Sequence, residues 1–202
     1  MKRNILISIA LTTSIAFASD ANLTKEHNVT EGNVTISPIV KEGVGYIKTV
    51  GKMLKSNMKK HMLADKSGVQ AVAFCASQAS EITKEASKTF PKGVRVYRTS
   101  TKVRNPNNKP DATDLEVLNF LEKEIEEKSF KKKPLLKKLE NNTTRVYVPL
   151  LVEKVCTKCH GDTHKINPEI NKIINTQYPK DKAINYKEGD LRGVIVAEMP
   201  SK

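Results

Sequence analysis

A five-residue motif, Cys156-Thr157-Lys158-Cys159-His160, constrains this chain more than any other feature of its sequence. Its spacing puts two thiols one helical turn apart on the same side of the backbone. A histidine directly after the second thiol lies against any flat group that the thiols hold. This is the attachment pattern of c-type heme, in which the thiols add to the two vinyl groups and the imidazole is the proximal iron ligand. We therefore predict one covalent heme c, bound by Cys156, Cys159 and His160.

Three other interpretations of the motif are weaker. A zinc site made of Cys156, Cys159, His160 and His164 would have its ligand pairs far closer together than zinc-finger spacing. A thioredoxin-like redox pair requires a βαβ context, which the surrounding pattern lacks. A structural disulfide leaves the adjacent histidine unexplained.

The first eighteen residues have the pattern of an export signal. A basic start at Lys2 and Arg3 precedes an apolar run and the small-residue cleavage pattern Ala16-Phe17-Ala18. A membrane anchor is the alternative, but the run is interrupted by hydroxyl residues and is shorter than the ~20 residues that span a bilayer. We predict a signal peptide at 1–18, a periplasmic location for the mature protein, and no membrane span after cleavage.

The net charge of the chain indicates which classes of partner it can bind. The 202 residues carry a formal net charge of +13, and removal of Lys2 and Arg3 with the signal leaves +11. This favours an acidic protein partner, in redox chemistry or signalling, or an anionic membrane surface. Nucleic acid is a poor candidate, because an exported protein does not meet it and no recognition motif is present.

Residues 19–37 form a polar segment without periodicity, which we interpret as a flexible linker. It contains three N-x-[ST] acceptors, each with an acidic residue two positions before the asparagine, and Glu140-Asn141-Asn142-Thr143-Thr144 repeats the pattern. Glycosylation and chance in an Asn/Thr/Glu-rich stretch both remain open. Residues 38–202 are then one domain.

Periodicity predicts helices over about 39–63, 67–89 and 113–127, and a short helix within 168–186. Strands are expected over 94–99, 144–152 and 191–198, and residues 131–138 as an exposed basic excursion. Long helices followed by strands and short helices indicate an α+β fold with a mostly antiparallel sheet.

The second axial ligand of the iron is less certain from the residues. Cys75 lies on a helical stripe of small apolar residues that would suit a flat macrocycle: Val72, Cys75, Ala79, Ile82 and Ala86. Free cysteine is also a common core residue, so coordination and burial both stay open. Met58 and His61 are the competitors, whereas His164 would lie on the proximal side and His27 in the linker.

Several stretches together resemble a family of PAS-like domains that carry a single c-type heme. The most specific is Val96-Tyr97-Arg98-Thr99-Ser100-Thr101-Lys102-Val103-Arg104-Asn105-Pro106. Weaker matches are Ala71-Val72-Ala73-Phe74-Cys75, Pro110-Asp111, Tyr147-Val148-Pro149, the heme motif itself and Gly189-Asp190-Leu191-Arg192-Gly193-Val194. The resemblance covers about residues 40–198.

The resemblance implies a PAS-like antiparallel sheet with long N-terminal helices packed against it, and axial ligation by His160 and Cys75. Within the most specific stretch, Arg98, Lys102 and Arg104 are candidate partners of the heme propionates, with Arg145 and Arg192 as secondary ones. Ordinary surface or sheet-edge charge is the alternative for each of them. The family role implied is sensing of redox state or of a diatomic gas such as NO.

We therefore expect a sensing heme module. A small periplasmic electron-transfer cytochrome is the alternative, favoured by the basic charge and by the lack of a signalling domain in the sequence. An enzyme is not expected, because no distal acid/base pair of His and Arg accompanies Cys75.

Overall fold

The computed structural model describes residues 28–30, 33–35 and 37–201. The predicted signal peptide and most of the predicted linker, His27 included, lie outside these residues. Within the linker the structure has two short strands, β1 (Asn28–Thr30) and β2 (Asn33–Thr35), paired antiparallel. The boundaries proposed for the signal, the linker and the domain stay predictions.

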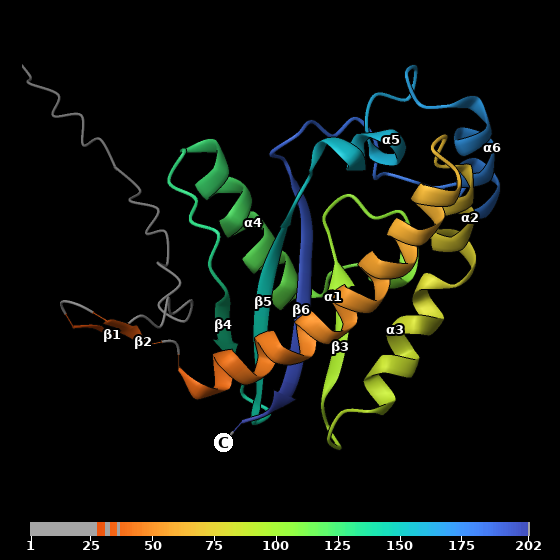
Figure 1. Cartoon of the computed structure of the whole chain (residues 1–202). Helices are drawn as coiled ribbons and strands as arrows, with labels where there is room; N and C mark the ends of the chain where they lie inside the picture. The colour runs from red at the N-terminus through yellow and green to blue at the C-terminus, as the bar shows by residue number, and fades with distance from the viewer. Residues whose placement is uncertain (1–27, 31–32, 36, 202) are drawn as a thin grey trace, which may run out of the picture.

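A four-stranded antiparallel sheet of order β3-β6-β5-β4 is the centre of the domain (Figure 1). Its strands are β3 (Arg95–Thr99), β4 (Leu135–Lys138), β5 (Thr143–Leu151) and β6 (Leu191–Pro200). The two central strands pair over nearly their whole length, with one irregularity between Leu150 and Leu151. Alternate residues of these strands face opposite sides, so each face can bury a separate apolar cluster.

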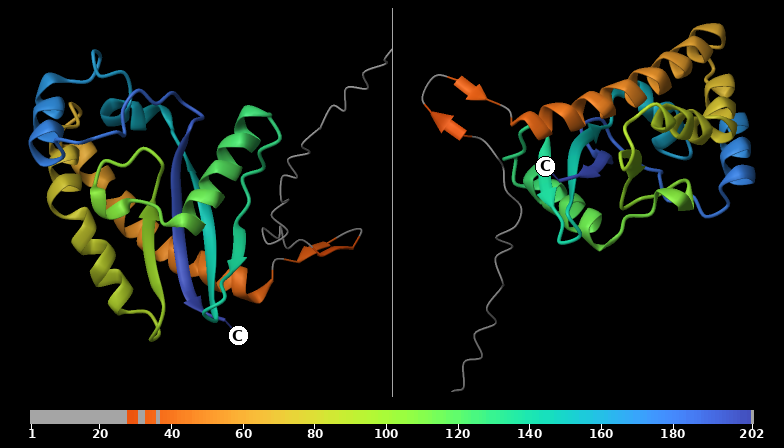
Figure 2. Two further views of the ribbon diagram at one scale, coloured as in Figure 1. Left: turned by 180° about the vertical axis from the view of Figure 1, so that it is seen from behind. Right: turned by 90° about the horizontal axis from the view of Figure 1, so that it is seen from below.

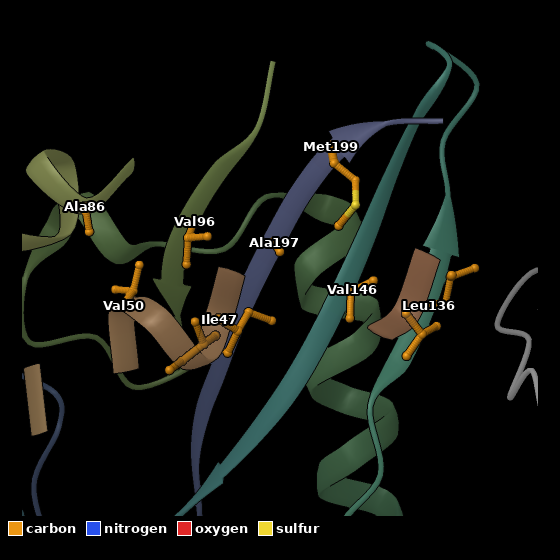
Figure 3. Close-up of a cluster of buried hydrophobic side chains, with 10 residues drawn as sticks. Ile47, Val50, Ala86, Val96, Leu136, Val146, Ala197 and Met199 are labelled. Atoms are coloured by element: carbon orange, nitrogen blue, oxygen red, sulfur yellow. The ribbon is translucent and has the colours of Figure 1, made fainter. Parts of the chain in front are cut away.

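Helix α1 (Pro38–Ala64) lies diagonally across one face of the sheet. Its apolar stripe at three- and four-residue steps buries Val40, Ile47 and Val50. These residues pack with side chains of all four strands and of α3. Figure 3 labels eight members of this cluster: Ile47, Val50, Ala86, Val96, Leu136, Val146, Ala197 and Met199.

The predicted helix 67–89 is two helices, α2 (Val69–Ser77) and α3 (Ala79–Lys88). The break is at Gln78, whose φ of −120° lies outside the α region. The break lets α3 lie beside β3 while α2 continues away from the sheet (Figure 1).

Helix α4 (Ala112–Glu126) covers the opposite face of the sheet, as the view from behind shows (Figure 2). Its buried Val117, Leu118 and Leu121 pack against the other set of alternate strand residues, which includes Tyr147 and Val196. Helices on both faces bury the sheet and leave its two ends for function.

One local expectation was wrong. Residues 135–138 are not an exposed excursion but the edge strand β4, in which Leu135 and Leu136 are buried and face opposite sides of the sheet. Tyr97 faces α4, where its hydroxyl donates to Asp114 at 3.0 Å.

The remaining elements gather at one end of the sheet. They are the short helices η1 (Pro106–Asn108), η2 (Lys154–Cys156) and α5 (Thr157–His160), with α6 (Pro168–Gln177) beyond. The expected fold class, α+β with an antiparallel sheet and N-terminal helices packed against it, is confirmed. Among the described residues no helix is long and apolar enough to cross a bilayer.

Candidate functional site

The cysteine motif lies directly after β5, where the chain turns through η2 into the four-residue helix α5. The Thr157 hydroxyl donates to the carbonyl of Lys154 at 2.8 Å and tightens this turn. Gly161 follows the last helical residue, and this position requires glycine because a Cβ there would lie 2.5 Å from the Thr157 carbonyl oxygen. The local fold therefore presents Cys156 and Cys159 from one short turn, and both are free thiols.

His160 is held as a neutral ligand would be. Its Nδ1 lies 2.8 Å from the carbonyl oxygen of Ala183. A carbonyl only accepts, so Nδ1 carries the proton and Nε2 keeps a free lone pair. Burial, together with the positive charges of Arg192 and Arg104, lowers the pKa of His160 to about 3. The imidazole is thus neutral across the physiological range and oriented by a backbone group, as metal-binding histidines usually are.

Arg104 fixes the backbone around this histidine. Its side chain is 11% exposed and pairs with Asp181 at 3.0 Å. One guanidinium nitrogen also donates to the carbonyl of Cys159 at 2.6 Å and to that of Ala183 at 3.1 Å. Arg104 therefore ties the second cysteine to the carbonyl that orients His160. These contacts favour a positioning role over the propionate contact expected from the sequence.

Cys75 is exposed on α2 and is not part of the hydrophobic core, so the burial alternative for this residue is not what the structure has. Surrounding protein still desolvates the thiol enough to raise its pKa, against the opposing charges of Arg98 and Arg104.

Cys75 and the cysteine motif are neighbours in space. Burial raises the pKa of Cys159 to about 11, and the charge of Cys75 is among the further causes. Cys159 also packs against the cluster formed by Val72 of α2 and the isoleucines of α6, Ile170 among them. Figure 1 shows α2, α5 and α6 together at the same end of the sheet. The fold thus brings an early helix and the late motif to one place.

The other distal candidates are placed differently. The His61 ring stacks on buried Phe74 with 4.9 Å between ring centroids, so it is a packing residue between α1 and α2. Met58 is half-buried on α1. His164 is exposed beyond α5, where its backbone N–H donates to Asp162.

Positive charge surrounds the motif. Arg98 of β3 has no hydrogen bond or ion pair with any residue that the structure describes, and desolvation lowers its pKa. Among the residues that the structure describes, Arg192 of β6 donates only to the Lys102 carbonyl, at 3.3 Å. Arg98 and Arg192 are therefore guanidinium groups without a carboxylate partner among the described residues.

Tyr186 connects these charges to His160. Its ring lies edge-on to the imidazole, 6.2 Å between centroids. The exposed Lys102 and the half-buried Arg192 each face the same tyrosine ring, at 5.0 and 5.5 Å. Sequence reasoning missed Tyr186, because nothing local marks a tyrosine that reaches the motif from 26 residues downstream in the chain.

Arg145 is the one propionate candidate that lies elsewhere. Its guanidinium is buried between the sheet and α4, paired with Asp111, Asp114 and Glu198. It belongs to a structural network on the face opposite α1.

A metal-only site does not fit this region. The described residues contain no group of three or more His, Cys, Asp or Glu side chains that could hold a metal ion, which argues against zinc. A neutral imidazole with a free Nε2, two free thiols in one turn and unpaired guanidinium groups do fit a heme, which needs one ligand, two attachment points and countercharge for its carboxylates. A cavity of about 160 Å³ beside α6, lined by Thr163, Ile174 and Asp181 among others, is far too small for this group.

Comparison with known proteins gives one family match and one fold match. Residues 17–200 match the family model described as Tll0287-like. The crystal structure of the cyanobacterial heme-protein Tll0287 superposes with a TM-score of 0.56 at 22% sequence identity. The match covers 83% of this chain and 98% of that one, and at this identity it shows the fold. No curated protein is significantly similar in sequence.

Proposed function

The chain belongs to the Tll0287-like family, and from this premise we propose that it is an exported protein with one heme, held covalently by Cys156 and Cys159. The observation that carries the proposal is the hydrogen bond from His160 Nδ1 to the Ala183 carbonyl, which leaves Nε2 free for iron. The family resemblance supports the same assignment, and so does the structural match, since the matched protein is a heme protein.

Cys75 is the proposed second axial ligand. It is an exposed thiol on α2, close enough to the motif for its charge to contribute to the raised pKa of Cys159. The heme would supply a redox-active iron that binds small diatomic molecules. The protein would supply the ligands, and Arg98, Arg192 and Lys102 would neutralise the carboxylates.

A redox or diatomic-gas sensor is the role that this ligand set favours. A thiolate adds negative charge at the iron and stabilises its ferric form, so reduction weakens the bond and can release the ligand. An electron carrier needs a coordination shell that does not change. The basic surface favours the carrier alternative, because it suits docking to acidic redox partners.

The test uses the purified mature protein and its ferric and ferrous absorption spectra, each with and without NO. Intact mass first establishes whether one heme is attached. We expect Cys75→Ala to convert a low-spin ferric spectrum to a high-spin one while the heme stays attached through Cys156 and Cys159. Met58→Ala and His61→Ala are the controls and should leave the spectrum unchanged.

Two outcomes would contradict the proposal. If mass and spectrum show no covalent heme, the assignment of the motif fails. If Cys75→Ala leaves the spectrum intact and one control alters it, the distal ligand is the control residue. A wild-type ferrous protein that binds no NO and keeps both ligands would favour the electron carrier over the sensor.

A further inference from the structure

The outward face of α1 carries a line of lysines. Five of these lysines are separated along the chain by steps of seven, four, three and four residues, which at 100° per residue place them on one stripe of the helix. These residues are Lys41, Lys48, Lys52, Lys55 and Lys59, and each is exposed. Glu42, near the N-terminal end, is the single acidic residue of the helix. Because the opposite side of α1 is buried against the sheet, this charge faces solvent permanently.

The C-terminal half of this stripe adjoins the cysteine motif. Lys55 Nζ lies 3.8 Å from the Glu153 carboxylate, three residues before Cys156. Lys158, inside the motif, donates to the carbonyl of Lys66 at 2.9 Å, just beyond the end of α1. The basic surface of the helix therefore continues onto the segment that presents the thiols, with the exposed Glu153 as one acidic residue within it.

An apolar side chain lies within this charged surface. Val155 is 42% exposed and is one of four exposed large apolar residues among those described; Met53 and Leu63 of α1 are two of the others. Val155 stands between Lys154, which is also exposed, and Cys156. A small apolar centre with a charged rim is the arrangement of protein–protein interfaces. A membrane surface would instead favour a broader apolar face that inserts between lipids.

We propose that the basic face, formed by Lys52, Lys55, Lys154 and Lys158 around Val155, docks an acidic one-electron carrier protein. The inference rests on the proposed function, since the docked partner would lie beside the heme attachment segment. One electron leaves the reduced partner and converts ferric to ferrous iron, and no covalent bond forms or breaks. A redox sensor and an electron carrier both require such an exchange.

The experiment compares two variants of the full mature protein that change its net charge equally. One carries Lys52→Glu, Lys55→Glu and Lys154→Glu. The control carries Lys131→Glu, Lys132→Glu and Lys138→Glu, which are exposed lysines on and before the edge strand β4. Reduced flavodoxin, an acidic electron donor, is the probe. The rate at which reduced flavodoxin reduces the heme is measured at several salt concentrations. The rate with an uncharged quinol is measured under the same conditions.

Charge reversal on the basic face should lower the rate with flavodoxin by about tenfold at low salt and flatten its salt dependence. The control should change that rate less than about threefold on the same steering argument. The rate with the quinol should not change in either variant. Equal slowing in both variants, or in neither, would overturn the proposal.

Binding without electron transfer separates this inference from the proposed function. Anisotropy of labelled, oxidised flavodoxin measures association whether or not a heme is present. If the protein lacks heme, the proposed function is contradicted. If flavodoxin still binds to that protein, and the variant with Lys52→Glu, Lys55→Glu and Lys154→Glu abolishes the binding, the docking face is retained. Cosedimentation with phosphatidylglycerol vesicles, without flavodoxin binding, would assign the face to a membrane surface and overturn the protein partner.

Discussion

At the scale of single residues, two arginines from the same stretch of sequence have opposite surroundings. Arg104 is committed to Asp181 and to the carbonyls of Cys159 and Ala183. Arg98, six residues earlier, has no such partner among the described residues. The first arginine therefore shapes the site, and the second leaves positive charge available to a ligand.

This contrast predicts different effects on stability. Arg104→Gln removes one partner of a buried ion pair and leaves Asp181, whose side chain is 5% exposed, without its countercharge. We expect a loss of about 3 kcal/mol in the free energy of unfolding. Arg98→Gln, the matched control, should cost less than about 1 kcal/mol because it breaks no pair. Urea unfolding measures both. Equal losses would show that Arg104 is not a positioning residue.

At the scale of elements, periodicity predicted α1, α4 and α6, because each helix buries one regular face. Apolar alternation or an apolar run predicted the strands β3, β5 and β6, of which the two central ones are buried on both faces. The sequence pattern missed the break at Gln78, since the residues on either side are all compatible with a continuous helix. It also missed β4, where the lysines around Leu135 and Leu136 resemble an exposed segment although both leucines are buried.

In the candidate site, too, local patterns predict some residues and not others. The thiols and His160 are adjacent in sequence, so their pattern alone indicates the chemistry. Cys75 was recognised by its position on a helical stripe and by family resemblance. Tyr186 and the contacts of Arg104 depend on chain segments that meet only in the folded protein, so no local pattern could predict them.

Two glycines of α1 give a prediction at the element scale. A Cβ at Gly43 would lie 2.6 Å from Met199 Cε and 2.8 Å from Val146 Cβ, whereas one at Gly45 would meet nothing within 4 Å. Gly43→Ala should therefore force α1 off the sheet and lower the free energy of unfolding by about 1–3 kcal/mol. Gly45→Ala should raise it by about 0.5–1 kcal/mol, because alanine favours the helix. Thermal and urea unfolding of the pair would refute the close packing if both variants were stabilised.

At the scale of the whole molecule, one buried polar network joins three strands to α4. Arg145 of β5 pairs with Glu198 of β6 and with Asp111 and Asp114 at the start of α4. Glu198 also pairs with Arg95 of β3. The network lies on the face opposite α1 and holds the sheet to α4, while α1 covers the other face and the candidate site lies at one end of the sheet.

The network predicts how stability depends on pH. Burial alone would raise the pKa of Glu198, but hydrogen bonds from Arg95 and Arg145 outweigh it and hold that pKa below its usual 4.5. A carboxylate with a lowered folded-state pKa stabilises fully above its unfolded pKa and loses that contribution as pH falls through the folded value. Glu198→Gln should therefore lower the free energy of unfolding by about 1–3 kcal/mol at pH 7.

The same substitution should matter progressively less below pH 4.5, because the wild-type carboxyl then becomes protonated and loses its charge as well. Burial raises the pKa of Asp114, which is present in both proteins and shares Arg145 with Glu198 in the wild type. Urea unfolding of wild type and variant from pH 7 to pH 3 measures the difference. A difference that stays constant over this range would mean that Glu198 acts through packing, because only an ionic contribution disappears on protonation.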